Sequence, residues 1–160
     1  KLISTHANYI CFRLATVFGY SYRMRTDLLV NNFVETAVKK GKLEIFEPNF
    51  RRNFIHINDI VDAFLFSIKN FAKLKNNIFN LGLSSANISK INLARKIKKV
   101  IPKTKVIINK KGNDPDKRDY FVSNKKIEKA GFKAKVSLDE GIRELNGIFQ
   151  NCDIKFINNY

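Results

Sequence analysis

The sequence is poor in the residues that usually build disulfide frameworks, metal centres and phosphate-binding loops. It has 2 Cys, 2 His and 7 Gly among its 160 residues. Cys11 and Cys152 are too distant in the sequence to indicate a disulfide framework or a metal-binding knuckle. His6 and His56 belong to no cluster of His, Cys and acidic residues with the spacing of metal ligands. The glycines are isolated and no G-x-S-x-G motif occurs, so these residues predict no metal site and no catalytic nucleophile.

Long hydrophobic runs are also missing. No apolar run approaches the length of a membrane-spanning helix, and the chain does not open on a basic segment followed by an apolar one, as a signal peptide would. Together with the sparse cysteine, this favours a cytoplasmic protein with no membrane partner. The chain opens with KLISTHANYICFRL, without an initial Met, and this stretch looks like the end of a helix leading into a strand. We therefore expect a fragment whose upstream part is missing.

Acidic residues are scarce relative to basic ones. The chain has 14 Asp and Glu against 30 Lys and Arg, which gives a formal net charge of +16. Such an excess allows a nucleic-acid-binding function. However, the lysines are scattered over segments that should be solvated, and abundant Lys, Asn and Ile are what an AT-rich coding sequence produces. We expect no nucleic-acid partner, and a basic nucleic-acid-binding domain stays as the weaker alternative.

Strand-like and helix-like segments alternate along the chain, which predicts an α/β fold. The expected strands, rich in β-branched and aromatic residues, are 9–18, 43–46, 54–57, 78–82 and 106–108. The expected helices, with apolar residues at helical spacing, are 28–41, 60–72, 90–101, 124–132 and 140–149. Strand 9–18 is apolar enough to be buried on both faces, as in the interior of a parallel sheet.

Side chains that can cap helices stand at most of the expected helix starts. The expected N-caps are Asp27, Asn58 or Asp59, and Ser89, with a capping box at Ser137 and Glu140. Helix 60–72 should carry one broad apolar face. Its members are Ile60, Val61, Phe64, Leu65 and Ile68.

Two polar side chains fall inside apolar strands. His56 should be a buried imidazole bonded to a backbone carbonyl or to Asp59, and not a metal ligand or a catalytic base. Arg13 must be paired or hydrogen-bonded if it is buried. It could anchor the structure or reach a site at the strand end, and we favour the structural role.

The arginines at positions 51, 52 and 118 differ from these because we expect them in loops at strand ends, where α/β proteins bind ligands. The planar fork of a guanidinium matches phosphate oxygens. Two arginines from separate loops could therefore clamp a diphosphate. Since surface arginines are common, the pattern alone also allows an inert surface role.

Four segments, in this order and spacing, resemble the C-terminal half of the extended short-chain dehydrogenase/reductases. They are FRLATVFG (12–19), RRNFIHINDIVDAF (51–64), IFNLGLSSANIS (78–89) and DPDKRDYFVSNKKIEKAGFK (114–133). The resemblance extends over nearly the whole chain, and it is to the NAD-dependent epimerases and dehydratases that act on nucleotide-diphosphate sugars. It implies the C-terminal part of a Rossmann-type parallel sheet plus the smaller α/β substrate-binding domain.

The implied fold crosses between these two domains more than once. Residues 1–22 would end the Rossmann domain and 54–82 would return to it. Residues 23–53 would be a segment of the substrate domain, 83–150 its C-terminal part, and 151–160 a tail.

The resemblance implies that the partner is a nucleotide-diphosphate sugar and gives roles to individual residues. Arg52 and Arg118 would bind the substrate's diphosphate. Relatives often have Asn at the position of Thr16, where it meets the substrate phosphate. This chain has Thr, so Asn31 or Asn32 would supply a replacement amide.

At the cofactor, the resemblance implies that Leu14, Ala15 and Val17 line the nicotinamide end. Asp114 or Asp116 would lie near the nucleotide's ribose. The cofactor would be NAD, with NADP as the alternative.

The family's glycine-rich pyrophosphate loop and its Tyr-x-x-x-Lys pair, in which Tyr is the acid/base, are both absent from the sequence. We therefore expect no catalytic residues in this chain, and a fragment that is inactive alone. It would be the nucleotide-sugar-binding portion of an NAD-dependent epimerase/dehydratase, a homodimer when intact, with NAD bound mainly by the missing upstream half. Hydride transfer would take place at the sugar. The alternative within the same fold is a non-catalytic protein that binds NAD(P) or a nucleotide sugar.

Overall fold

The computed structural model describes residues 8–109 and 118–151. Its strands are β1 (Ile10–Leu14), β2 (Thr16–Phe18), β3 (Lys42–Ile45), β4 (Arg51–His56), β5 (Asn77–Leu81), β6 (Asn87–Ser89) and β7 (Lys105–Ile108). Its helices are α1 (Leu29–Lys40), α2 (Ile57–Lys69), α3 (Phe71–Leu74), α4 (Lys90–Val100), α5 (Lys125–Lys129) and α6 (Leu138–Asn151), with a 3-10 helix η2 (Ser84–Ala86). The alternation of strands and helices confirms the α/β fold.

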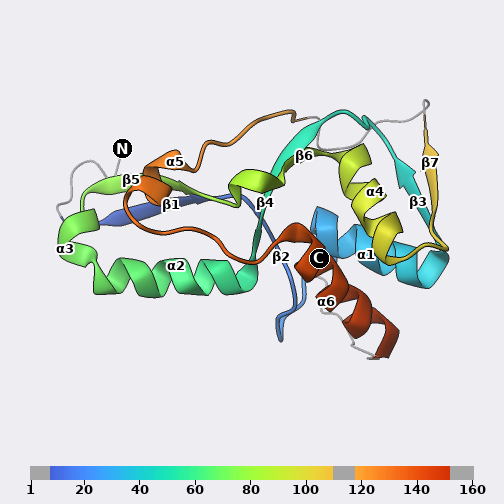
Figure 1. Ribbon diagram of the computed structural model, residues 1–160, viewed down its shortest axis with the longest axis horizontal. Coiled ribbons are helices and arrows are strands. Elements are labelled where there is room, and N and C mark those ends of the chain that lie inside the picture. The colour runs from blue at the N-terminus through green and yellow to red at the C-terminus, as the bar shows by residue number, and fades with distance from the viewer. Residues whose placement is uncertain (1–7, 110–117, 152–160) are drawn as a thin grey trace.

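Parallel pairing dominates the described strands. β1 pairs with β5, β2 with β4, and β3 with β7, each in parallel, while β6 is antiparallel to β4. Figure 1 shows β1, β5, α2 and α3 toward one end of the long axis and β3, β7, α1 and α4 toward the other. Strands β2 and β4 connect the two ends, so the residues that they carry face both halves of the molecule.

The expected single strand 9–18 is two strands, and burial on both faces is wrong for its first part. β1 follows β5, and the N–H of Ala15 still donates to the carbonyl of Leu81 at 2.9 Å. β2 then leaves β5 and places Thr16 opposite Phe54 of β4. Arg13 and Leu14 are exposed, and no strand in the described residues pairs with the other edge of β1.

One hydrophobic core packs α1, α4 and α6 against β3 and β4. Its fully buried members include Val34 of α1, Leu93 of α4 and Ile142 of α6. Phe18 and Phe54 bring β2 and β4 into the same cluster.

A second core lies between β1, β5 and α2. It is formed by Ala15, Ile55, Ala63 and Leu81, among others. Ile127, at the centre of α5, also packs there, so a segment late in the sequence joins the core of the first strands.

The apolar face expected on the helix after His56 exists, but most of it is open to solvent. Ile60 is buried, whereas the next four members are between 49% and 72% exposed; they are Val61, Phe64, Leu65 and Ile68. The ring of Phe64 meets that of Phe12 edge-on, with 5.3 Å between centroids. This exposed stripe of α2 is therefore continuous with the open edge of β1.

The expected cap at Asp27 is wrong. The N-cap of α1 is Leu28, with no side-chain capping bond. Asp27 instead accepts a hydrogen bond from Nε of Arg25 at 3.0 Å, because the two side chains meet within the loop. At the other end of the helix, Gly41 adopts the left-handed conformation expected of a helix stop, with φ of 63°.

Two other helix starts confirm the sequence expectation. Oγ of Ser89 accepts from the N–H of Asn92 at the start of α4. At the start of α6, Ser137 and Glu140 form the reciprocal bonds of a capping box.

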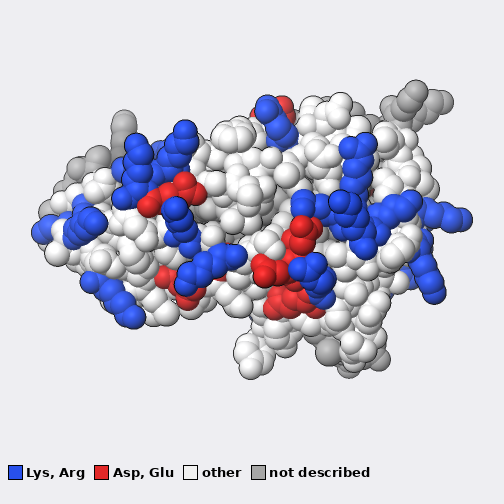
Figure 2. Space-filling view, viewed as in Figure 1, with Lys and Arg blue, Asp and Glu red and all other residues white. Residues whose placement is uncertain are grey.

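The charged surface shows no single basic field on the face seen in Figure 2. Lys and Arg side chains lie in separate groups toward both ends, and acidic side chains lie among them. Of the described helices, none is long and apolar enough to cross a membrane.

Two glycines of α6 provide a matched test of the packing. A Cβ on Gly141 would lie 2.3 Å from Cε2 of Phe18 and 3.0 Å from Cδ2 of His56, whereas a Cβ on Gly147 would meet nothing within 4 Å. We expect Gly141→Ala to lower the free energy of unfolding by about 1–3 kcal/mol through overpacking. Gly147→Ala should raise it by about 0.5–1 kcal/mol. Urea unfolding of both variants checks this, and equal effects would contradict the packing of α6 on β2.

Candidate functional site

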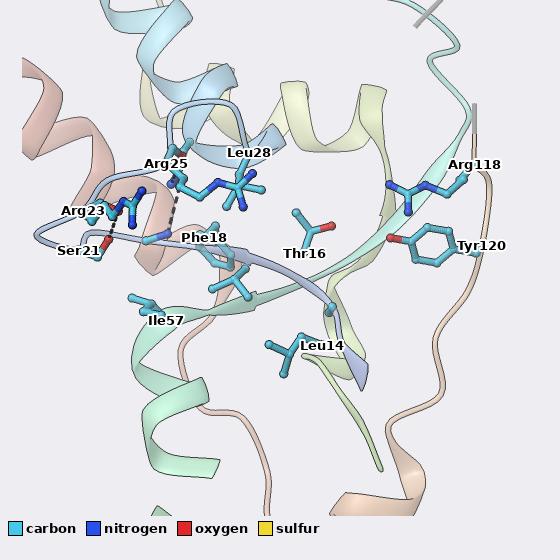
Figure 3. Close-up of a pocket in the computed structure, with 14 residues that line it drawn as sticks. Leu14, Thr16, Phe18, Ser21, Arg23, Arg25, Leu28, Ile57, Arg118 and Tyr120 are labelled. Atoms are coloured by element: carbon cyan, nitrogen blue, oxygen red, sulfur yellow. Dashed lines mark hydrogen bonds between the residues drawn. The ribbon is translucent and has the colours of Figure 1, made fainter. Parts of the chain in front are cut away.

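The larger of two adjoining pockets follows strand β2 and has a volume of about 510 Å³. Residues 14–19 form one wall, where the chain passes from β1 through β2 to Gly19. Figure 3 shows Arg23 and Arg25 on one side and Arg118 with Tyr120 on the opposite side, with Thr16 between them. The pocket thus has an apolar wall along the strand and cationic groups at both ends.

A smaller pocket of about 230 Å³ adjoins the first. Thr16, Leu28 and Arg118 line both. The residues that line the smaller pocket alone are Asp27, Leu29, Asn32, Arg52 and Lys90. Since basic side chains outnumber the single acid in this lining, the smaller pocket suits an anion.

The two neighbouring arginines of RRNFIHINDI lie at the start of β4, and not in the loop that the sequence suggested. Successive side chains of a strand point to opposite faces, so the two guanidinium groups diverge. Arg52 is only 3% exposed and lines the smaller pocket. Arg51 is exposed and pairs with Asp119 at 3.1 Å.

The guanidinium of Arg52 is held in a fixed plane. Its Nη1 donates to the carbonyl of Arg51 at 2.9 Å, and its Cζ lies 5.3 Å from the centroid of the Tyr120 ring. Contact with an aromatic face orients a guanidinium. Arg52 is therefore held in a defined orientation in the lining of the smaller pocket.

The segment that carries Arg118 and Tyr120 is tied to β4 and β6. The N–H of Arg51 donates to Oδ1 of Asp119 at 2.8 Å, and Asn87 exchanges two hydrogen bonds with the backbone of Val122, at 2.9 and 3.0 Å. The Arg51 guanidinium beside Asp119 lowers the pKa of that carboxyl below its ordinary value of 3.8. This ion pair and these hydrogen bonds place the segment against the mouth of both pockets.

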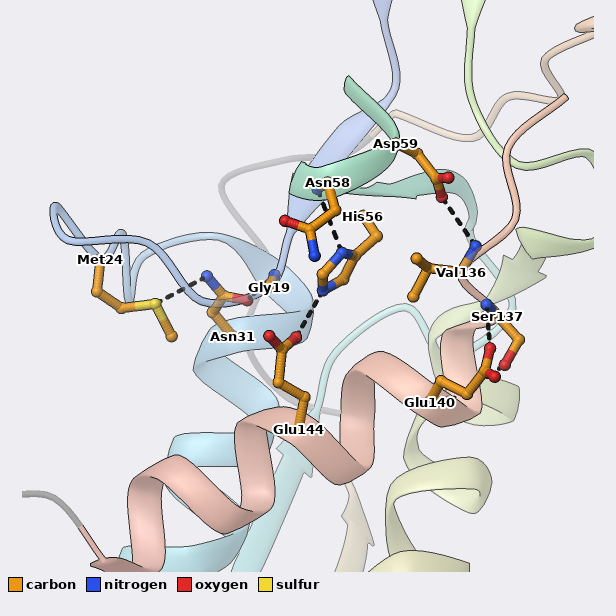
Figure 4. A network of polar contacts seen from close by, with 10 residues as sticks. All are labelled: Gly19, Met24, Asn31, His56, Asn58, Asp59, Val136, Ser137, Glu140 and Glu144. Carbon is orange, nitrogen blue, oxygen red and sulfur yellow. Dashed lines mark hydrogen bonds and ion pairs between the residues drawn. The ribbon is translucent and has the colours of Figure 1, made fainter. Parts of the chain in front are cut away.

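His56 is a buried structural imidazole, as expected, but its partners differ from those predicted. Its Nε2 lies 2.6 Å from Oε2 of Glu144, on α6 (Figure 4). Its Nδ1 accepts from the N–H of Asn58 at 3.3 Å, which makes His56 the N-cap of α2. Because Nδ1 accepts, Nε2 carries the proton and donates to Glu144.

The cap expected at Asn58 or Asp59 is therefore wrong, because both residues lie inside α2. Asp59 has another role. Its carboxylate accepts from the N–H groups of Lys135 and Val136 at 2.8 and 3.1 Å, and so ties the start of α2 to the chain leading into α6.

Asn31 and Asn32 have different surroundings, although they are neighbours on α1. The Asn31 amide is buried, and both of its ends are hydrogen-bonded within the protein. Its Oδ1 accepts from the N–H of Gly19 at 3.1 Å, and its Nδ2 donates to the carbonyl of Arg25 at 2.9 Å. It shapes the loop between β2 and α1. Asn32 is exposed and lines the smaller pocket.

All eight binding residues suggested by the sequence line one or both pockets. The larger pocket has Leu14, Ala15, Thr16, Val17, Asn31 and Arg118, and the smaller has Thr16, Asn32, Arg52 and Arg118. Asp114 and Asp116 lie outside the described residues. No group of three or more His, Cys, Asp or Glu that could hold a metal ion occurs within residues 8–109 and 118–151.

Sequence reasoning missed several polar residues of this site, among them Arg23 and Arg25 of the larger pocket, Lys90 of the smaller one, and Tyr120. Tyr120 follows Arg118 by two positions, which in an extended chain places both side chains on one face. Lys90 directly follows the N-cap of α4, and nothing in the local pattern separates it from the other lysines of that helix.

Comparison with known proteins identifies the family. The sequence model of the NAD dependent epimerase/dehydratase family matches residues 3–82, half of the chain. The chain belongs to this family. The resemblance read from the four sequence motifs is thereby confirmed.

Solved structures of epimerases share the fold. UDP-glucose 4-epimerase of Thermotoga maritima, solved with UDP-glucose, matches with a TM-score of 0.73 and 24% identity, over 89% of this chain and 46% of that one. ADP-L-glycero-D-manno-heptose-6-epimerase of Helicobacter pylori gives 0.72 and 20%, over 94% and 48%.

A curated relative is similar in sequence. GDP-L-colitose synthase of Yersinia pseudotuberculosis is 26% identical over 121 residues, which are 74% of this chain and 39% of that protein. The chain of this family member thus spans less than half the length of each of these three relatives.

The pairing of Arg51 with Asp119 predicts a pH effect with a definite sign. A carboxyl whose pKa is lowered by folding stabilises the fold above its unfolded pKa, and this contribution is lost as pH falls through the lowered value. We expect Arg51→Gln to raise the pKa of Asp119 toward its ordinary 3.8. An NMR titration of the Asp119 carboxyl checks this. Arg95→Gln, on the exposed side of α4, is the control, and an unchanged Asp119 in Arg51→Gln would refute the pairing.

Proposed function

We propose that the chain is the nucleotide-sugar-binding portion of an NAD-dependent epimerase or dehydratase. The observation that carries the proposal is the guanidinium of Arg52, which is buried, oriented by Tyr120 and yet lines the smaller pocket. A buried cation beside a pocket is suited to an anionic ligand, and the guanidinium fork matches phosphate oxygens. The diphosphate of a nucleotide sugar fits this description.

The two pockets together suit a ligand with a diphosphate in its middle. Arg118 and Thr16 line both pockets, so a ligand that occupies both must pass them. With its diphosphate near Arg52 and Arg118, a nucleotide sugar would extend its sugar into the larger pocket. The exposed amide of Asn32 is then available to the phosphate end, whereas that of Asn31 is already used within the loop.

The residues of this chain fit only one end of the cofactor. Leu14, Ala15 and Val17 supply an apolar wall to the larger pocket, which suits the face of a nicotinamide ring. The sequence has no glycine-rich loop for the cofactor's pyrophosphate, so we propose that NAD, or NADP, is held mainly by residues upstream. The bound cofactor would exchange hydride with a sugar carbon, and the role of this chain is to hold the sugar nucleotide in place.

The open side of the second core supports this division of roles. The free edge of β1 and the exposed apolar stripe of α2 form one continuous surface that nothing in the described residues covers. A parallel sheet with a helix on its face normally continues with further strands. We propose that the remainder of a Rossmann domain covers this surface. The second core then belongs to that domain, and the core of α1, α4 and α6 to the substrate domain.

Removal of the Arg52 guanidinium tests the proposed diphosphate contact. We expect Arg52→Ala in the full-length protein to raise the KM for its nucleotide sugar at least tenfold, because a hydrogen bond to a charged group contributes about 1.5–3 kcal/mol. Steady-state kinetics with a panel of nucleotide sugars provides the measurement. Arg95→Ala, an exposed arginine on α4, should leave KM within about twofold. A normal KM in Arg52→Ala would remove the assignment.

A second test separates substrate binding from cofactor binding. Residues 1–160 produced alone should bind UDP or another nucleoside diphosphate but not NAD, and should show no turnover. Isothermal titration calorimetry with each ligand measures both. Stoichiometric binding of NAD to this chain would contradict the proposal that the cofactor is held upstream.

A further inference from the structure

One part of the wall of the larger pocket lies where β2 and β4 finish and α2 begins. Phe18, Gly19 and Ile57 line the pocket there. His56, the residue before Ile57, is only 2% exposed. Its ring meets the ring of Phe18 edge-on, with 5.3 Å between the centroids. The imidazole of His56 therefore packs directly behind this part of the wall.

Gly19 is held between two side chains, as Figure 4 shows. Its N–H donates to Oδ1 of the buried Asn31 at 3.1 Å. The imidazole of His56 is so close that a Cβ on Gly19 would lie 2.4 Å from Nε2. Gly19 also has a φ of 113°, a conformation that residues with a side chain rarely adopt. The backbone of the pocket wall at Gly19 therefore depends on where the His56 ring lies.

Two hydrogen bonds fix the orientation of this ring. Nδ1 accepts from the N–H of Asn58 at 3.3 Å, which caps the start of α2. Nε2 lies 2.6 Å from Oε2 of Glu144. Because Nδ1 accepts, it carries no proton, and the carboxylate of Glu144 stabilises the tautomer with the proton on Nε2. Glu144 thus determines both the orientation and the tautomer of His56.

Glu144 belongs to α6, which no sequence motif links to the pockets. Gly141 lies one turn earlier on the same face of the helix, and a Cβ there would be 2.3 Å from Cε2 of Phe18. The helix therefore passes directly against the end of β2. Whereas His56 is buried, the side chain of Glu144 is 36% exposed. Position 144 can consequently accept substitutions that would not fit around the imidazole.

We propose that Glu144 is a positioning residue for the larger pocket. It acts through His56, whose ring supports Phe18 and Gly19 and caps the helix that begins with Ile57. This inference rests on the proposed function, in which the larger pocket holds the sugar beside the nicotinamide. Hydride transfer needs the sugar in place to within about 1 Å, so a loss of this support should lower kcat. The residues that line the smaller pocket lie elsewhere, so binding of the nucleoside diphosphate should not change.

Three substitutions at position 144 separate the reach of the side chain from its charge. Glu144→Gln keeps an oxygen acceptor at the same reach, Glu144→Asp keeps the charge but is shorter by one methylene, and Glu144→Leu removes the acceptor. We expect kcat of the full-length protein to fall about tenfold or more in the Leu and Asp variants, and to stay within about threefold of wild type in Glu144→Gln. Steady-state kinetics measures this with the nucleotide sugar that the wild type converts fastest among UDP-, GDP-, ADP- and dTDP-sugars.

The affinity for the nucleoside diphosphate of that substrate separates the two pockets. Calorimetry should give a Kd within about twofold of wild type in all three variants, since their effect is confined to the larger pocket. Arg143→Leu, an exposed neighbour on the same helix, is the control and should leave kcat and Kd unchanged. Equal losses of kcat and of nucleoside diphosphate affinity in Glu144→Leu would overturn the proposal and make Glu144 a residue of general structural importance.

The tautomer of His56 is a readout that a general loss of stability would not produce. Nitrogen-15 NMR of the histidine-labelled protein distinguishes a proton on Nε2 from one on Nδ1. We expect the Nε2–H form in the wild type and in Glu144→Gln, and a mixture of tautomers in Glu144→Leu. A pure Nε2–H form in Glu144→Leu would show that Glu144 does not control the ring, against the proposal.

The kinetic outcomes distinguish this inference from the function on which it rests. Wild-type kcat in Glu144→Leu or Glu144→Asp, or a Glu144→Gln variant as slow as Glu144→Leu, would overturn this inference alone. If Glu144→Leu does not fold, Glu144→Asp, which keeps the charge at this partly exposed position, decides the question. A wild-type protein that converts none of the nucleotide sugars contradicts the proposed function, and this inference with it.

Discussion

Strand β4 is the element through which the two cores and the two pockets are held together. Five of its six residues are buried, and its side chains alternate between different surroundings. Phe54 packs in the core of α1, α4 and α6, while Ile55 packs in the core of β1, β5 and α2. Since a shift of one residue would exchange these faces, the register of β4 with β2 and β6 is strongly determined. The same register sends Arg52 to the pocket and Arg51 to solvent.

The polar residues of β4 also depend on distant parts of the chain. Nδ2 of Asn53 donates to the carbonyl of Leu83, and Oδ1 accepts from Nδ2 of Asn124. A Cβ on Gly82 would lie 1.8 Å from Oδ1 of Asn53, so a glycine directly after β5 lets the chain pass this side chain. At the end of β4, His56 joins α2 to α6 through Glu144. These contacts link β4 to α6, although the buried Oδ1 of Asn124 has no hydrogen-bond partner among the described residues.

How far the sequence predicts this structure depends on how local each signal is. The stop at Gly41, the cap at Ser89 and the capping box of α6 involve residues within a few positions of one another, and all three could be predicted. The cap by His56 could not, because the imidazole is oriented by Glu144, 88 residues later. The exposure of the α2 stripe could not be predicted either. An apolar helix face indicates that other residues pack against it. It does not indicate whether those residues belong to the same part of the chain.

For the site, the residues that could be predicted are those in the family's motifs, and those that were missed meet only in three dimensions. Thr16, Arg52 and Arg118 lie far apart in the sequence, and they converge because β2 pairs with β4 and because Asp119 is bound by Arg51. Tyr120 orients Arg52 only after that convergence, so no local pattern marks it. The same is true of Lys90, which looks like one more lysine in a basic helix until its burial is known.

The net charge of +16 says little about the ligand, because most of the charged side chains lie on the surface. Exposed charges are screened by salt within about 10 Å and contribute little to any single contact. A buried cation is screened much less, so its interaction with an anion is stronger at the same distance. Under the proposed function, the buried Arg52 in a pocket of about 230 Å³ would therefore matter more for ligand binding than the many lysines on the surface.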